Sequence, residues 1–148
     1  AMALVDIMER LPGNHPGYAK LHALLKDVVE GLKNVQDPQT GLWFQVLDQG
    51  GRPGNWIETS GSMMYIYAIK KAIRLKYIDP AYSSVAARAW EGLRSYIETD
   101  AKGQPVITGA VRGMGVQKNF ERYVSFARLK NSTHGLMAIQ LASSEMEW

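Results

Sequence analysis

Two kinds of helical stretch alternate along this chain of 148 residues, and the alternation limits the folds open to it. Stretches of the first kind are apolar almost all round, at residues 1–11, in the first half of 59–77, and at 133–147. The second kind, at 17–35 and 80–97, carries one apolar stripe opposite a polar face. A helix without a polar face must be surrounded by protein, whereas a one-faced helix covers a surface. We therefore expect an all-α fold, in which helical hairpins repeat around an axis as an inner and an outer layer.

The connections between these layers differ in length. Those that lead from an inner to an outer helix are short, at 12–16 and 78–79, whereas the return connections at 36–58 and 98–132 are long. Every long loop therefore falls at the end of the molecule where inner helices begin. Because binding residues usually lie in loops that a rigid scaffold holds together, we expect a site at this end.

Local signals place the smaller elements. Alternating side chains predict a short strand at 42–47, and three glycines with Pro53 end it before the helix at 59–77. A second short strand is predicted at 106–108, after a turn at Lys102 and Gly103. Asp79 followed by Pro80 is typical of a helix start. Residues 131–133 are expected to cap a final helix that runs to Trp148.

Composition argues against several classes of protein. The chain has no cysteine, so it has no disulfide and no thiolate metal site. Its net charge of +3 is spread rather than clustered, which gives no indication of nucleic-acid binding. No apolar run reaches the length of a membrane span, and no signal peptide is visible, which favours a cytoplasmic over a periplasmic location without deciding it. We expect a single domain over 1–148, with no metal and no organic cofactor.

Candidate binding residues gather at the end with the long loops. Tryptophan faces stack on sugar rings, and polar groups fix hydroxyls and carboxylates. The residues of these types near the expected mouth are Trp43, Trp56, Glu58, Ser60, Arg112 and His134. Each has a structural alternative, because the tryptophans suit a core, Glu58 suits the N–H groups of a helix start, and most loop arginines bind nothing. No two carboxylates have a spacing that identifies a glycosidase pair, so the sequence predicts no catalytic residue.

Three motifs carry a resemblance to known enzymes. They are Gly41–Asp48 (GLWFQVLD), Arg52–Ser60 (RPGNWIETS) and Thr133–Gly135 (THG). With them the chain resembles glycoside hydrolase families 88 and 105, the unsaturated glucuronyl and rhamnogalacturonyl hydrolases, and is closer to family 105. The similarity extends over nearly the whole chain, and residues 41–62 are its most specific part. It implies a six-hairpin α/α barrel, of which 1–148 would be the C-terminal two and a half hairpins.

The resemblance also implies a reaction. In these families an aspartate protonates the double bond of a 4,5-unsaturated uronic acid at the non-reducing end, water adds, and the resulting hemiketal collapses to release the neighbouring sugar. The responsible aspartates belong to the N-terminal half and have no match here, so this chain alone is expected to be inactive. The implied partners are the oligosaccharide and the missing half of the barrel. The residues that carry over are supporting ones near the mouth: Trp43, Trp56, Glu58, Ser60 and His134. The segment 112–128 departs from the family pattern, which leaves the preferred leaving sugar open.

A different class of function is a non-catalytic helical module that binds carbohydrate or associates with itself. Part of a toroid exposes the apolar sides of its first and last inner helices, and such patches favour association. An unrelated helical-repeat protein is a weaker alternative, because the loops are unequal and no fixed repeat period is present.

Overall fold

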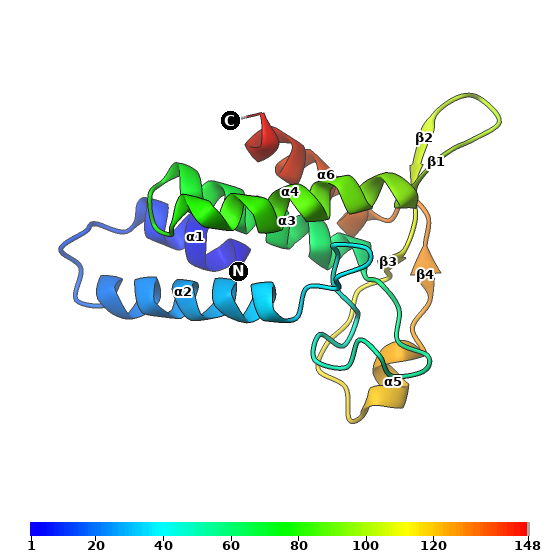
Figure 1. Cartoon of the computed structure of the whole chain (residues 1–148), viewed down its shortest axis with the longest axis horizontal. Coiled ribbons are helices and arrows are strands. Elements are labelled where there is room, and N and C mark those ends of the chain that lie inside the picture. The colour runs from blue at the N-terminus through cyan, green and yellow to red at the C-terminus, as the bar shows by residue number, and fades with distance from the viewer. Residues whose placement is uncertain (148) are drawn as a thin grey trace.

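A computed structural model describes residues 1–147, and its elements are mainly helices (Figure 1). The predicted end of the last helix, Trp148, lies outside the described residues. The longer helices are α1 (Met2–Arg10), α2 (Tyr18–Asn34), α3 (Thr59–Arg74), α4 (Ser83–Leu93) and α6 (Thr133–Met146). Among the residues described, no helix combines the length and the apolar character needed to cross a bilayer.

The two layers predicted from the sequence are confirmed. Helix α3 is the central element, because it packs against α1, α4 and α6, while α2 packs on α1. Helices α1 with α2, and α3 with α4, form hairpins, and α6 adds a third inner helix (Figure 1). The long connections at 36–58 and 98–132 lie together at one end, as expected, and contain the short helix α5 (Phe120–Val124).

The core lies between the inner helices. The first half of α3 is buried on nearly all sides, as its lack of a polar stripe predicts, with Met63, Ile66, Ala68 and Ile69 fully inaccessible. Helices α3 and α6 each carry alanines four positions apart that are also fully buried: Ala68, Ala72, Ala138 and Ala142. Small side chains at this spacing allow two helices to approach closely.

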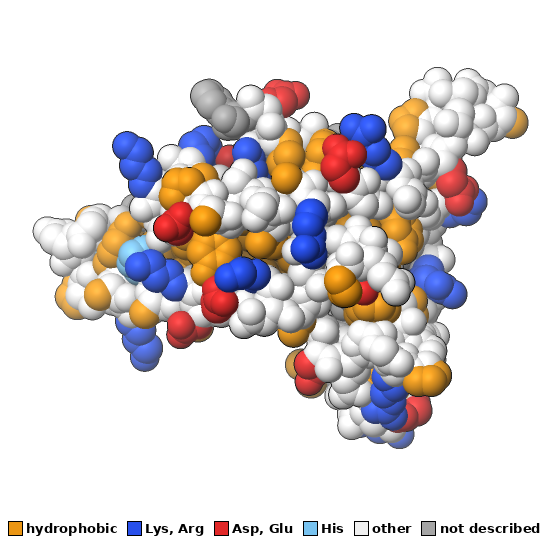
Figure 2. Space-filling view, viewed as in Figure 1, with side chains coloured by type: hydrophobic (Ala, Val, Ile, Leu, Met, Phe, Trp, Pro, Cys, Tyr) orange, Lys and Arg blue, Asp and Glu red, His pale blue; other side chains and the backbone are white. Residues whose placement is uncertain are grey.

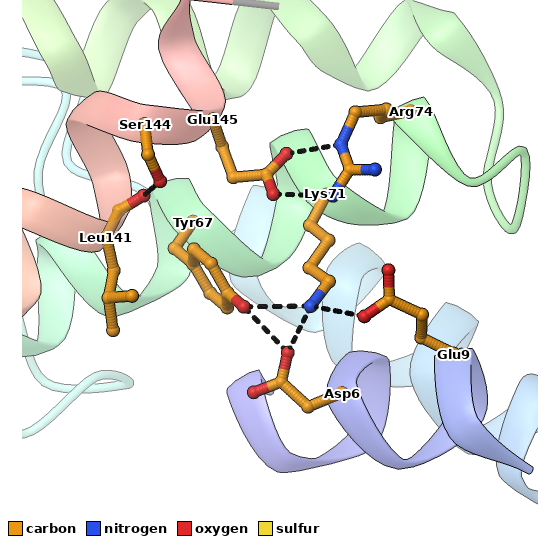
Figure 3. A network of polar contacts seen from close by, with 8 residues as sticks. All are labelled: Asp6, Glu9, Tyr67, Lys71, Arg74, Leu141, Ser144 and Glu145. Atoms are coloured by element: carbon orange, nitrogen blue, oxygen red, sulfur yellow. Dashed lines mark hydrogen bonds and ion pairs between the residues drawn. The ribbon is translucent and has the colours of Figure 1, made fainter.

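A polar network joins the inner helices toward the C-terminal end of α3 (Figure 3). The Lys71 ammonium lies 2.7 Å from the Asp6 carboxylate and 2.9 Å from that of Glu9, and it donates to the Tyr67 hydroxyl. Arg74 forms a two-pronged ion pair with Glu145 of α6, at 2.7 and 2.8 Å. These contacts fix α1 and α6 on the two sides of α3.

Two predicted helices are shorter than expected. The helix predicted at 59–77 ends at Arg74, and Lys76 turns into the left-handed region with φ of 59°. The helix predicted at 80–97 divides into a 3₁₀ turn (Pro80–Tyr82), α4, and a second 3₁₀ turn (Arg94–Tyr96). The apolar stripe in the sequence extends beyond the end of α4 because Tyr96, although it lies in the second 3₁₀ turn, still packs on the core. The start is as predicted, since the Asp79 carboxylate caps the Ala81 N–H at 2.8 Å.

Two small antiparallel sheets lie within the second long connection. Strand β1 (Ile97–Thr99) pairs with β2 (Pro105–Ile107), around a turn where Gly103 has φ of +76°. Strand β2 is the strand predicted at 106–108, shifted by one residue. Strand β3 (Ala110–Val111) pairs with β4 (Arg128–Leu129), a pairing that no sequence signal indicated.

The strand predicted at 42–47 is wrong. Only Phe44 pairs, as an isolated antiparallel bridge with Ile57. The pairing stops because the Asn55 side chain takes the place of a partner strand: its amide donates to the Val46 carbonyl at 2.9 Å and its oxygen accepts from the Val46 N–H at 3.2 Å. A side chain that satisfies both backbone groups of one residue leaves no ladder to extend.

The charged side chains on the face drawn in Figure 2 are mixed in sign, with apolar side chains between them. Lysines and arginines do not gather into one basic patch on this face.

Candidate functional site

A pocket of about 550 Å³ opens at the N-terminal ends of α3 and α6. This is the end at which the long loops meet (Figure 1). Five stretches supply its walls: the loop before α3, the start of α3, β3 with the loop that follows it, α5, and the start of α6. The lining residues are Gln45, Glu58, Ser60, Gly61, Met64, Val111, Gly113, Met114, Gly115, Val116, Tyr123 and His134.

Glu58 caps α3 from the floor of this pocket. It is 8 % exposed, and both of its carboxylate oxygens are engaged. One accepts from the Ser60 N–H, the Ser60 hydroxyl and the Val111 N–H at 3.1, 2.6 and 2.9 Å, and the other accepts from the Gly61 N–H. A carboxylate suits this position because it satisfies N–H groups that have no partner within the helix. Four donors therefore hold the Glu58 carboxylate in its capping position, three on one oxygen and one on the other.

The hydroxyl side chains near the start of α3 all make internal hydrogen bonds. Ser60 is 3 % exposed and donates to Glu58, so its hydroxyl faces the cap. Thr59 donates to the Thr108 carbonyl at 2.7 Å. Ser62 donates to the Glu58 carbonyl and accepts the Trp43 N–H. These hydroxyls hold the floor of the pocket together, and among them only Ser60 lines it.

His134 stands at the opposite wall, in the first turn of α6. Its side chain is exposed and lies against Gly113, where a Cβ would come within 3.0 Å of the His134 ring. Gly113 has φ of +113°, a conformation that other residues rarely adopt. The glycine therefore allows the loop to approach the histidine closely. Ser132 caps the helix below, accepting from the Gly135 N–H at 3.1 Å, as the sequence predicted for this region.

The two tryptophans lie outside the pocket lining. Trp43 is 1 % exposed, donates its indole N–H to the Leu32 carbonyl at 2.8 Å, and packs edge-on against Tyr65. Trp56 is 7 % exposed and donates to the Val124 carbonyl at 3.2 Å. Neither presents a ring face to the pocket, so the structure gives them the core interpretation that the sequence also allowed.

Arg112, which the sequence placed near the mouth, does not line the pocket. Arg112 lies in the loop after β3, is exposed, and is not among the lining residues. The residues that sequence reasoning missed include Gln45, Met64, Met114, Val116 and Tyr123. No pattern marked them, because most are aliphatic and their approach depends on how 112–124 folds back over 45–64. Among residues 1–147, no three metal-ligating side chains come together.

The family model described as Glycosyl Hydrolase Family 88 matches residues 1–148. The chain belongs to this family. The chain is also similar to two curated proteins, Protein Atu3128 of Agrobacterium fabrum and the 24.9 kDa protein in the picA locus of Rhizobium radiobacter. Each is 35% identical over 121 residues, which is 78% of this chain and 51% of the relative. The family 88 chain thus spans about half the length of these curated relatives.

Solved structures agree with the family and the fold. A glycoside hydrolase of family 105 from C. acetobutylicum matches with a TM-score of 0.92 and 35% identity, over 99% of this chain and 42% of the other. A possible member of family 105 from Salmonella enterica matches with a TM-score of 0.84 over 98% of this chain and 36% of the other. At 24% identity the second shows the fold alone. The expected partial α/α toroid and the resemblance to families 88 and 105 are therefore confirmed.

Proposed function

We propose that this chain forms one wall of the substrate cleft of a glycoside hydrolase that acts on unsaturated oligosaccharides. The substrate carries a 4,5-unsaturated uronic acid at its non-reducing end, as in fragments of pectic rhamnogalacturonan. The reaction is hydration of the double bond, followed by collapse of the hemiketal and release of the neighbouring sugar. The pocket at the start of α3 and α6 holds part of this substrate.

The observation that carries this proposal is the pocket itself. It opens at the loop end of a family 88 chain and combines aliphatic side chains with a few polar ones, which is the usual character of a small-molecule site. His134 is the exposed polar group proposed to contact the substrate, while Glu58 and Ser60 support the wall from beneath. Trp43 and Trp56 act further back, by holding the loops that carry the lining.

The proton donor is proposed to lie outside this chain. Glu58 is the only carboxylate among the lining residues, and its oxygens already accept four hydrogen bonds. A general acid needs a proton aimed at the substrate within hydrogen-bond reach. We therefore expect the chain to hydrate no substrate by itself and to require a further half-barrel that supplies the acid.

An ultraviolet assay tests both parts of the proposal. Loss of the conjugated double bond would be followed with unsaturated rhamnogalacturonyl and glucuronyl disaccharides, using the chain alone and then joined to all coding sequence that adjoins it. We expect consumption only by the longer protein. Activity of the chain alone would refute the external acid, and Glu58→Gln would then show whether Glu58 acts after all. Inactivity of both proteins on both substrates would refute the hydrolase.

Exposed apolar side chains favour a second function, that of a self-associating module. Ile7 on α1 and Leu136 and Met137 on α6 are 49%, 43% and 42% exposed, on helices that the layered fold places inside. Sedimentation velocity of the chain would show a discrete dimer if these faces pair. A monomer at all concentrations would exclude the module.

A further inference from the structure

The hydroxyl of Tyr123 has an unused hydrogen-bond donor in the pocket. Tyr123 lines the pocket from α5, and its oxygen accepts the backbone N–H of Gln117 at 3.0 Å. A phenol has one donor and can also accept, so this bond orients the oxygen and leaves its proton available. Within residues 1–147 that hydroxyl makes no other hydrogen bond.

Tyr123 is held in place by contacts that converge on α5 from the loop before α3. The Arg52 guanidinium lies 3.8 Å from the Phe120 ring centre and pairs with Glu121 at 2.6 Å. The Trp56 indole N–H binds the Val124 carbonyl, on the residue after Tyr123. The Asn119 side chain caps the start of the helix at the Arg122 N–H. Five residues of helix would not be stable alone, so these contacts explain why α5 sits over the pocket.

The rest of the lining suits the ring of a sugar. Met64, Val111, Met114 and Val116 supply aliphatic surface, and Val116 is 96% exposed. An exposed valine gains by covering the C–H face of a ligand, because that contact removes apolar surface from water. A sugar lying on this surface presents its hydroxyl and ring oxygens sideways, toward polar groups at the rim.

We propose that Tyr123 is a substrate-binding residue, which donates a hydrogen bond to one oxygen of the sugar that lies on this aliphatic wall. The Arg52 and Trp56 contacts are then positioning interactions, which set the hydroxyl by seating α5. This assigns the RPGNW segment a role in binding through α5 rather than through stacking of its tryptophan. The inference rests on the proposed hydrolase function and names a further residue of the same pocket.

The test is Tyr123→Phe, which keeps the ring and removes only the oxygen. The protein used is the chain with its adjoining coding sequence, and the probe is the unsaturated rhamnogalacturonyl disaccharide together with its mono-deoxy analogues. We expect KM for the parent disaccharide to rise about three- to tenfold, the usual range for one lost neutral hydrogen bond, with kcat little changed. For the analogue that lacks the accepting oxygen, the variant and the parent protein should have the same KM.

Two controls separate ligand binding from anchoring of the loop. Tyr82→Phe also removes a hydrogen-bonded hydroxyl, which joins the 3₁₀ turn before α4 to Glu30 of α2, and should leave KM unchanged. Tryptic cleavage at Arg112 and Lys118 reports whether losing the bond to Gln117 frees the loop. An equal rise in KM for every analogue, with faster cleavage, would mean that Tyr123 only anchors the loop and would overturn the proposal. An unchanged KM would overturn it as well.

Failure of the proposed function gives a different result. If the parent protein neither consumes nor binds any of these disaccharides, the hydrolase and the role of Tyr123 are both refuted. If the parent protein consumes them and Tyr123→Phe does so equally well, only the role of Tyr123 is refuted.

Discussion

The Glu58 carboxylate accepts the backbone N–H of Val111 at 2.9 Å, across 53 positions of sequence. Through this bond one side chain both caps α3 and fixes the strand β3 from which the pocket loop departs. Glu58→Gln should therefore weaken two elements at once. The glutamine amide would present its own N–H to the Gly61 N–H, which leaves this partly buried donor unpaired, so we expect a loss of about 1–3 kcal/mol in the free energy of unfolding. Urea titration measures it.

Glu91→Gln is the matched control for this change. Glu91 is paired with Arg94, but the two side chains are 63% and 75% exposed. Exposed ion pairs contribute little, so the variant should stay within about 0.5 kcal/mol of the parent protein. Equal effects of the two substitutions would contradict the structural role given to Glu58.

Two helical glycines should respond to alanine in opposite ways. At Gly92 in α4, a Cβ would lie 1.9 Å from the Thr40 carbonyl oxygen, which is backbone and cannot move aside cheaply. At Gly31 in α2, a Cβ would meet nothing within 4 Å. Gly31→Ala should stabilise by about 0.5–1 kcal/mol through helix propensity.

Gly92→Ala gains the same propensity but must displace α4 from the turn at Thr40. We expect a net loss of at least about 2 kcal/mol, in the range of overpacked cores. Thermal unfolding of the two variants beside the parent protein measures the expected gain in stability for Gly31→Ala and the expected loss for Gly92→Ala. Stabilisation by Gly92→Ala would show that α4 does not pack on this turn.

The layering could be predicted from the sequence because it rests on helical periodicity. The buried face of α3 and the cap at Asp79 are local patterns, and each was found where expected. The strand at 42–47 failed because its outcome depends on Asn55, whose amide bonds both backbone groups of Val46 across nine positions. The alternation of side chains within 42–47 does not indicate that a side chain outside this segment will bond its backbone groups.

The pocket was harder to predict than the fold for a related reason. Glu58, Ser60 and His134 were found because polar residues at helix starts are visible in the sequence. Tyr123 was not, since its place depends on Arg52 and Trp56, more than sixty positions earlier. Those two bonds arise only when the long loops fold against each other.

The ion pairs of Lys71 should make the free energy of unfolding depend on pH, and replacing Lys71 should remove this contribution. Burial alone would lower the pKa of Lys71, but hydrogen bonds with Asp6, Tyr67 and Glu9 outweigh it and raise that pKa above 10.5. The bond to Lys71 lowers the pKa of Glu9 below its ordinary 4.5. A lowered acid pKa contributes stability above pH 4.5 that is lost as the pH falls through the folded value. The raised lysine pKa contributes below pH 10.5 and is lost above the folded value.

Lys71→Met tests this linkage because methionine fills similar space without charge. At pH 7 the variant should be less stable by about 1–2 kcal/mol, a modest loss because Asp6 and Glu9 remain partly exposed to water. Thermal midpoints at pH 3 and pH 7 should show the gap between parent and variant narrowing at the lower pH. A gap that stays constant with pH would mean that the ammonium does not interact with the carboxylates.

Replacing Trp43 should lower the stability of the whole fold, whereas replacing Trp56 should weaken mainly the segment around α5. Trp43 fills the space beside Tyr65 and satisfies the Leu32 carbonyl, one of the last carbonyls of α2 with no partner within the helix. Trp43→Phe leaves that carbonyl unpaired and a gap in the core, and should cost about 2–4 kcal/mol of global stability. Trp56 satisfies only the Val124 carbonyl of α5, so Trp56→Phe should cost less stability and act locally.

Hydrogen exchange distinguishes the two variants, because Trp56→Phe should speed exchange chiefly at 120–125, whereas Trp43→Phe should speed it throughout α2 and α3. If Trp56→Phe left 120–125 as protected as in the parent protein, the seating of α5 by Trp56 would be refuted.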